Sequence, residues 1–312
     1  MTSQSSEDTD NTRASLLMLG SMAAFAFEDV FLKRAATALH PGQVMAMVGL
    51  AGALCFWAVA HAQGQPILTR RALTGAALVR SLSEAGASML YITALSLIPL
   101  SVNAALLQAS PLVVTMGAAL FLREPVGWRR WSAILIGFVG VLIILRPGTE
   151  GFEVAGLLTV ACVFILAARD LSTRMMPSDI GTFQLTTWAY LALVPAGLLL
   201  MGLGQTAPVP IAPGQWADMF IALVTGLVGY WAVTAAMRVG EVSFVAPFRY
   251  SRLVFSALLA ALFFGERPDI WMLAGATLII GSGLYTFARE RHLRQQRNRR
   301  LRSALSKHTL PR

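Results

Sequence analysis

Two stretches of the chain decide its fold. They are residues 101–125, SVNAALLQASPLVVTMGAALFLREP, and residues 243–268, SFVAPFRYSRLVFSALLAALFFGERP. Each contains a predominantly apolar run of about the 20 residues that one helical crossing of a bilayer requires. Each run ends at a polar turn that contains glutamate and proline. Both stretches are therefore predicted to be transmembrane helices, and their likeness to each other points to an internal repeat.

The composition of the whole chain agrees with a membrane protein. Of its 312 residues, 56% are hydrophobic and 13% are charged, and the mean hydropathy is +0.63. An ordinary soluble domain carries about 25% charged residues. The apolar runs predict ten transmembrane helices, over residues 14–34, 42–62, 72–97, 101–122, 128–146, 153–174, 180–203, 215–238, 242–264 and 268–288. The predicted fold class is an all-α integral membrane protein.

The two halves of the chain align with each other. Matching Ser101 with Ser243 also pairs Phe121 with Phe263 and Glu124 with Glu266, and near the start of each half Asp29 meets Asp170. Five helices per half is an odd number, so the halves must enter the membrane in opposite orientations, an arrangement common in secondary transporters. The predicted divisions are a disordered cytoplasmic N-terminus (1–13), two inverted five-helix repeats (14–146 and 147–289) and a basic cytoplasmic tail (290–312).

The chain has a formal charge of +9, and the positions of its basic residues indicate how it is oriented in the membrane. Cytoplasmic loops of membrane proteins hold the excess of lysine and arginine. That rule places both termini in the cytoplasm. The basic tail is expected to anchor the chain near anionic lipid. A nucleic-acid-binding arm is the alternative for the tail, but the chain's basic residues do not form an aromatic-studded surface, so no nucleic-acid partner is expected.

The motifs of metal-dependent and hydrolytic enzymes do not occur in the sequence. Cys55 and Cys162 stand apart in apolar runs, and the histidines at 40, 61, 292 and 308 are scattered. The chain contains no HExxH, GxSxG or phosphate-binding GxxxxGK[ST] motif. We therefore expect no metal, no cofactor and no catalytic residue. An intramembrane enzyme, a scaffold or receptor, and a channel stay as alternatives to a carrier.

The chain resembles the drug/metabolite transporter superfamily, in its ten-helix EamA-type branch, over residues 14–289. The resemblance is carried by the paired segments 121–125, FLREP, and 263–268, FFGERP, each followed by a Gly-rich helix. Residues 245–252, VAPFRYSR, are similar to a stretch of bacterial members linked to riboflavin or S-adenosylmethionine uptake; other relatives export amino acids. The resemblance implies a central cavity lined by helices one, three, four, six, eight and nine, which opens alternately to either side without ATP hydrolysis.

Charged residues inside the predicted spans are candidates for a transport pathway, because they are costly in lipid and usually face the bundle interior. They are Glu28, Asp29, Arg80, Glu84, Arg169, Asp170, Arg249 and Arg252. Arg80 and Glu84 have the spacing of a same-helix pair, either a structural salt bridge or a substrate or gating pair. The Glu28–Asp29 and Arg169–Asp170 doublets are candidates for function or for capping helix ends.

Arg249 and Arg252 share one helix face, which suits an anionic or carboxylate-bearing ligand. The alternative places Arg249 at the interface, reaching toward lipid headgroups. Gln108, Tyr230 and Tyr250 complete the predicted substrate-binding set, and tyrosine rings suit a flat heteroaromatic ligand.

Proton coupling and motion add a second group of candidates. Glu84 is the first candidate for a proton-carrying carboxylate and Asp29 the second. Pro111 and Pro247 interrupt two helices and are candidates either for hinges or for packing kinks.

The predicted function, in line with the resemblance, is a multi-pass secondary transporter that moves a small polar metabolite across the bacterial inner membrane by alternating access, with riboflavin and S-adenosylmethionine as lead candidates. An amino-acid or metabolite exporter is the alternative within the family, and an intramembrane enzyme or a channel is the alternative outside it. The expected partners are the small-molecule substrate and membrane lipid, and the oligomeric state is left open.

Overall fold

The computed structural model describes residues 2–67, 75–124, 126–149, 154–176, 180–239 and 242–308. These residues form helices and short connections, and none of them lies in a β-strand. The first half contains α1 (Thr2–Ala38), α2 (Pro41–Ala62), α3 (Gly75–Leu97), α4 (Leu100–Leu107), α5 (Ser110–Phe121) and α6 (Trp128–Leu145). The second half contains α7 (Gly156–Arg174), α8 (Thr182–Leu203), α9 (Pro213–Val239), α10 (Val242–Val245), the 3₁₀ helix η2 (Ala246–Tyr250), α11 (Ser251–Phe264) and α12 (Ile270–His308).

Nine segments within the described residues are long and apolar enough to cross a membrane. Two of these segments combine shorter elements: Leu100–Phe121 joins α4 to α5, and Ala246–Phe264 joins η2 to α11. The helix α3 has 23 residues but is not apolar enough to count among the nine. It carries Arg80 and Glu84. The long helices therefore match the ten predicted spans, with α3 as the most polar.

Two of the predicted spans are broken helices. The α-helix of residues 101–122 is interrupted at Gln108 and Ala109, between α4 and α5. The span 242–264 passes from α10 through η2 into α11. Pro111 and Pro247 each lie at the first or second position of the element that follows a break, where an amide hydrogen has no helical partner to lose. Each proline thus begins a new element and does not merely bend a continuous one.

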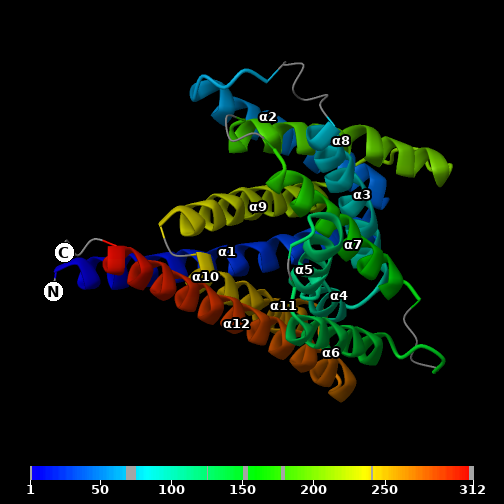
Figure 1. Ribbon diagram of the computed structural model, residues 1–312. Helices are drawn as coiled ribbons and strands as arrows, with labels where there is room; N and C mark the ends of the chain where they lie inside the picture. The colour runs from blue at the N-terminus through cyan, green and yellow to red at the C-terminus, as the bar shows by residue number, and fades with distance from the viewer. Residues whose placement is uncertain are drawn as a thin grey trace.

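The first and last helices are longer than the sequence analysis expected. The helical backbone of α1 starts at Thr2, where a disordered end was predicted, and that of α12 continues to His308, through most of the basic tail. Extending an existing helix requires no new nucleation, so polar residues can continue one that an apolar segment has started. Figure 1 shows the first turns of α1 and the last turns of α12 at the same side of the molecule.

The helices pack in pairs that connect the two halves. The helix α2 lies against α8, α6 against α12, α1 against α9, and α3 against α7 (Figure 1). The repeat makes α1 equivalent to α7 and α3 equivalent to α9, so the α1–α9 pair and the α7–α3 pair are the same contact in the two halves. The α2–α8 and α6–α12 pairs each join two equivalent helices. The packing therefore has the symmetry that a duplicated chain should have.

The equivalent helices run antiparallel. A β-carbon at Gly42, at the start of α2, would lie 2.5 Å from the carbonyl oxygen of Gly197 in the last turns of α8, and the reverse distance is also 2.5 Å. Farther along α2, Gly52 lies against the ring of Tyr190, which precedes Gly197 in α8. Gly140 and Gly275 bring α6 and α12 together in the same way, at 2.5–2.6 Å. Helices related by the repeat thus point in opposite directions, as inverted repeats require.

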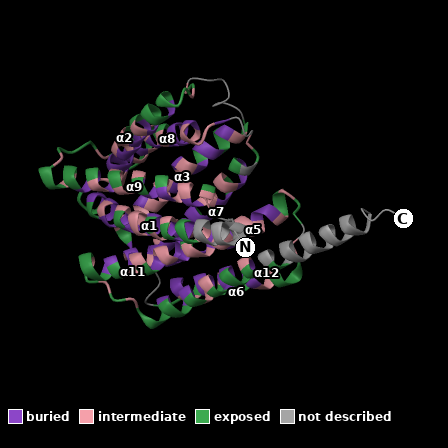
Figure 2. Cartoon of the chain, turned by 90° about the vertical axis from the view of Figure 1, so that its left-hand side faces the viewer, coloured by how far each residue is buried: buried purple, intermediate pink, exposed green. Residues whose placement is uncertain are grey.

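Apolar side chains cover both the interior and the outside of the bundle. Figure 2 shows buried residues where helices face each other and exposed residues along their outer sides. Many of the exposed residues are large and apolar, among them Leu54, Trp57, Leu198, Phe220 and Leu262. A surface of this kind suits contact with lipid chains. Inside, Tyr91 packs against both of the two largest apolar clusters.

Candidate functional site

An ion pair between the two halves lies in the middle of the bundle. Asp29 of α1 is only 1% exposed, and Arg252 of α11 donates from Nη2 to both of its carboxylate oxygens at 2.8 Å. Tyr91 of α3 donates from its hydroxyl to Asp29 Oδ1 at 2.7 Å. The Arg252 guanidinium also lies 5.4 Å from the centre of the Phe25 ring, a favourable cation–π distance. A buried carboxylate needs compensation of this kind.

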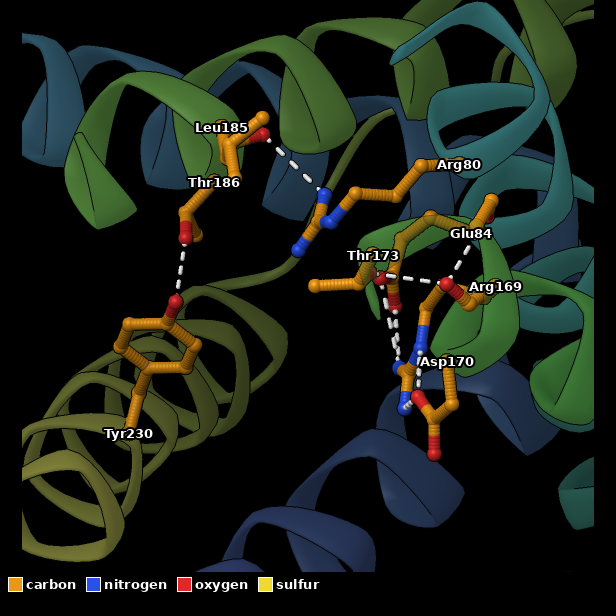
Figure 3. A network of polar contacts seen from close by, with 9 residues as sticks. Arg80, Glu84, Arg169, Asp170, Thr173, Leu185, Thr186 and Tyr230 are labelled. Atoms are coloured by element: carbon orange, nitrogen blue, oxygen red, sulfur yellow. Dashed lines mark hydrogen bonds and ion pairs between the residues drawn. The ribbon is translucent and has the colours of Figure 1, made fainter. Parts of the chain in front are cut away.

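A second charged cluster joins α3 to α7 (Figure 3). Arg169 of α7 donates to both carboxylate oxygens of Glu84, at 3.1 and 3.3 Å, and to Asp170 Oδ1 at 2.8 Å. Like the first cluster, this one links a helix of the first half to one of the second. The structure thereby brings together predicted site residues that are far apart in the chain.

Arg80 and Glu84 do not pair with each other, so the predicted same-helix pair is wrong. Arg80 directs its guanidinium to the carbonyl oxygen of Leu185 in α8 at 3.2 Å, while Glu84 turns to Arg169 (Figure 3). The spacing of four residues permits a pair but contributes only about 0.2–0.5 kcal/mol. A second helix that offers an arginine or a free carbonyl easily outweighs that preference.

Arg249 has a different environment from the other intramembrane arginines. It is exposed, and it forms no hydrogen bond or ion pair with any side chain that the structure describes. The charged groups that act on it are Asp170, Arg169 and Arg252. Arg169 and Arg252 are already bound to carboxylates, whereas the Arg249 guanidinium has no bonded partner among the described side chains.

Gln108 and Tyr250 meet at the two helix breaks. Gln108 donates from Nε2 to the carbonyl oxygen of Tyr250 at 3.1 Å. The alignment of the halves makes these two residues equivalent, so the contact lies on the pseudo-symmetry axis. The Tyr250 ring is turned toward α12, where its hydroxyl lies against Gly283 and its ring meets Phe287 edge-on at 6.4 Å. Both residues are buried, at 8% and 6% exposure, so they hold the two breaks together.

Tyr230 belongs to an aromatic cluster that the sequence analysis did not recognise. Its hydroxyl and that of Thr186 are 2.5 Å apart, and its ring lies 5.1 Å from the ring of Phe56 (Figure 3 shows the Thr186 contact). Phe56 also meets the rings of Tyr190 and Phe183, at 5.1 and 6.4 Å. The cluster joins α2, α8 and α9. Single aromatic residues in apolar runs do not show which of them meet, so no sequence signal identifies it.

Glu266 provides a further contact between the halves. Its carboxylate accepts hydrogen bonds from the backbone amides of Leu100 and Ser101, at 2.7 and 2.9 Å, and from the Ser101 hydroxyl at 2.7 Å. Lys33 Nζ lies 3.7 Å from the same carboxylate. A carboxylate at a helix N-terminus accepts hydrogen bonds from backbone amides that have no helical partner, and its negative charge interacts favourably with the positive end of the helix dipole. The repeated glutamate and proline segment, which served to recognise the family, is the signal that pointed to this residue.

The remaining residues considered from the sequence are the two prolines and the two cysteines. Pro111 and Pro247 lie at the breaks beside Gln108 and Tyr250. Cys55 and Cys162 are free thiols, and no group of three or more His, Cys, Asp or Glu side chains able to hold a metal occurs among the described residues.

A bundle of antiparallel repeats, with broken helices and charged clusters between its halves, has the architecture of a secondary carrier. The chain belongs to the EamA-like transporter family, whose model matches residues 12–146 and again residues 154–287. The double match confirms the duplication, and membership confirms the resemblance found in the sequence.

Several named bacterial proteins are similar to this chain. A riboflavin transporter of Vibrio cholerae is 34% identical over 59% of this chain and 61% of its own length. An S-adenosylmethionine uptake transporter of Rickettsia bellii is 28% identical over 63% of this chain and 67% of its own. The pseudopaline exporter CntI of Pseudomonas aeruginosa is 27% identical over 85% of this chain and 93% of its own. The match to the Vibrio protein thus spans less than two thirds of that relative.

A solved crystal structure has the same fold. It aligns with a TM-score of 0.62 at 21% identity, over 90% of this chain and 99% of that chain.

Proposed function

We propose that this protein is a secondary transporter that moves a small polar metabolite across the bacterial inner membrane by alternating access, with both termini in the cytoplasm. Riboflavin and S-adenosylmethionine are the first candidate substrates, because relatives with those names share up to about a third of the aligned residues. The role is that of a carrier and not of an enzyme or a channel.

The observation that carries this proposal is the guanidinium of Arg249, which has no bonded partner among the described side chains. Arginine donates several hydrogen bonds in one plane and binds carboxylates and carbonyl oxygens well. The flavin ring offers carbonyl oxygens, and the amino-acid part of S-adenosylmethionine offers a carboxylate. Arg249 can therefore bind either candidate, while the paired arginines next to it keep their own carboxylates.

The other predicted site residues take supporting roles in the proposal. Arg252 and Glu84 connect the halves through their ion pairs, and Arg80 ties α3 to α8. The aromatic cluster around Tyr230 provides ring faces for a flat ligand. Pro111 and Pro247 act as hinges, since each begins a new helical element beside the Gln108–Tyr250 contact.

Uptake into proteoliposomes tests the proposal directly. Labelled riboflavin, S-adenosylmethionine and amino acids are offered to wild-type protein, and saturable accumulation of one of them is expected. In Arg249→Gln, loss of a charge-assisted hydrogen bond of about 1.5–3 kcal/mol should raise the half-saturating concentration roughly 10- to 150-fold. Arg267→Gln is the matched control, because Arg267 is an exposed loop arginine. Equal uptake by Arg249→Gln and wild type would contradict the proposed site.

Export is the second candidate function. The pseudopaline exporter aligns over 85% of this chain, more than the uptake transporters do. Inverted membrane vesicles distinguish the two directions, because an exporter accumulates substrate in inverted vesicles and an importer accumulates it in right-side-out ones.

A further inference from the structure

Among the membrane-spanning residues whose side chains the structure describes, Glu28 is the one acid without a hydrogen-bond or ion-pair partner. Asp29 is bound by Arg252, Glu84 and Asp170 by Arg169, and Asp218 by Arg34. Glu28 forms neither a hydrogen bond nor an ion pair with any described residue, and it is half-buried in α1. An ionised carboxylate is costly in such a position unless something neutralises it.

No unpaired cationic side chain among the described residues faces Glu28. Its carboxylate lies against Gly226 of α9, where a β-carbon would come within 2.5 Å of Oε1. The titratable groups that face it are Asp29 on its own helix, Arg252 on α11 and Tyr190 on α8. On α3, the Tyr91 hydroxyl is directed at Asp29. Since Arg252 is already held by Asp29, no described side chain is left to neutralise Glu28, and protonation of its carboxylate removes the charge directly.

We propose that Glu28 is the proton-binding residue of this transporter, an inference that rests on the proposed transport function. It replaces Glu84 and Asp29 as the candidates. Both of those carboxylates hold an arginine, so a proton would first have to displace a guanidinium. At Glu28 a proton from water on one side of the membrane forms an O–H bond with the carboxylate, and the same bond breaks when the proton is released to the other side.

The position of Glu28 explains how proton binding acts on the bundle. Glu28 is adjacent to Asp29, whose pair with Arg252 connects α1 in the first half to α11 in the second. An ionised Glu28 competes with Asp29 for Arg252, and a protonated Glu28 does not. Proton binding therefore strengthens the contact between the halves, and proton release weakens it.

Infrared titration of the purified protein tests the proton site without a substrate. Wild-type protein should show a protonated carboxylic acid band that disappears as the pH is raised, and Glu28→Gln should lack that band. Glu28→Asp should restore it at a shifted frequency, which separates loss of the carboxyl from misfolding. Asp218→Asn, which alters an acid paired near the start of α9, should keep the band. A band of wild-type size in folded Glu28→Gln would overturn the proposal.

Transport of labelled riboflavin in proteoliposomes provides the second measurement. An imposed pH gradient should raise accumulation several-fold in wild type and leave it unchanged in Glu28→Gln, while exchange of labelled for unlabelled riboflavin continues in both. Gradient-driven accumulation by Glu28→Gln equal to wild type overturns the proposal. If the infrared result holds but wild type carries no riboflavin, the proton site stands and riboflavin is the wrong substrate.

Discussion

Asp29 and Arg252 show what an intramembrane charge requires of its neighbours. The carboxylate is almost inaccessible, and its two oxygens are occupied by the Arg252 guanidinium and the Tyr91 hydroxyl. Replacing Arg252 with glutamine leaves Asp29 as a buried negative charge without its positive partner. Removing one partner of a buried pair destabilises a protein by about 3–5 kcal/mol. We expect Arg252→Gln to unfold at a clearly lower temperature than wild type, as followed by thermal denaturation in detergent.

The double variant Asp29→Asn/Arg252→Gln is the control for this prediction. It removes both charges, so it should be less destabilised than the sum of the two single changes, and the difference measures their coupling. Arg252→Gln with wild-type thermal stability would show that the pair does not hold the halves together.

The residue scale is where the sequence predicted least. The charges within the spans were identified from the sequence, because a charge in an apolar run is visible as such. Their partners were not: spacing along one helix suggested that Glu84 pairs with Arg80, whereas its partner is Arg169, 85 positions away in the chain. Contacts between helices depend on how the halves pack, and a single sequence carries no direct record of that packing.

At the scale of helices, glycines fix how closely the equivalent elements approach. A β-carbon at Gly275 of α12 would lie 2.5 Å from the carbonyl oxygen of Gly140 in α6, so an added methyl group forces the two backbones apart. Overpacking of this kind costs about 1–3 kcal/mol. We expect Gly275→Ala to lower the unfolding temperature in detergent.

Gly281 supplies a matched control within the same helix. Nothing lies within 4 Å of a β-carbon built there. Alanine at an exposed helical position is favoured over glycine by about 1 kcal/mol. Gly281→Ala should therefore be as stable as wild type or more so, and equal losses in both variants would rule out close packing as the cause.

The helices themselves were largely predictable and their breaks were not. Length and apolarity located every long helix, because crossing the bilayer sets both properties. The interruption at Gln108 and Ala109 lies in a predominantly apolar run, and the nearby Pro111 is the helix-breaking residue that indicates it. A proline shows where a helix is weakened, whereas tertiary contacts such as Gln108 to Tyr250 decide whether the helix breaks.

For the whole molecule, the repeat links sequence, packing and function. Two halves with an odd number of helices each must have opposite orientations in the membrane. The α2–α8 and α6–α12 pairs run antiparallel, as this inversion requires. The inter-half ion pairs follow from it, since Asp29 and Arg169 each lie on the first helix of their own half and bind a residue of the other half. The sequence predicted the inversion because counting helices is enough to establish it.

The helix α3 decides how the chain crosses the membrane. If all ten long helices cross, both termini lie on one side, and if α3 does not cross, the termini lie on opposite sides. Its apolarity alone leaves it outside the clear spans, but its charges are engaged by Arg169 and by the Leu185 carbonyl, so lipid does not have to accommodate them. In Figure 1 the outer ends of α1 and α12 also point the same way. We therefore expect α3 to cross, with both termini in the cytoplasm.

Reporter fusions at the two termini should both report the cytoplasm, and truncated fusions after Gln63 and after Ile98, which bracket α3, should report opposite sides. Matching signals from the two truncated fusions would mean that α3 does not cross, and the inverted five-helix repeat would then have to be abandoned.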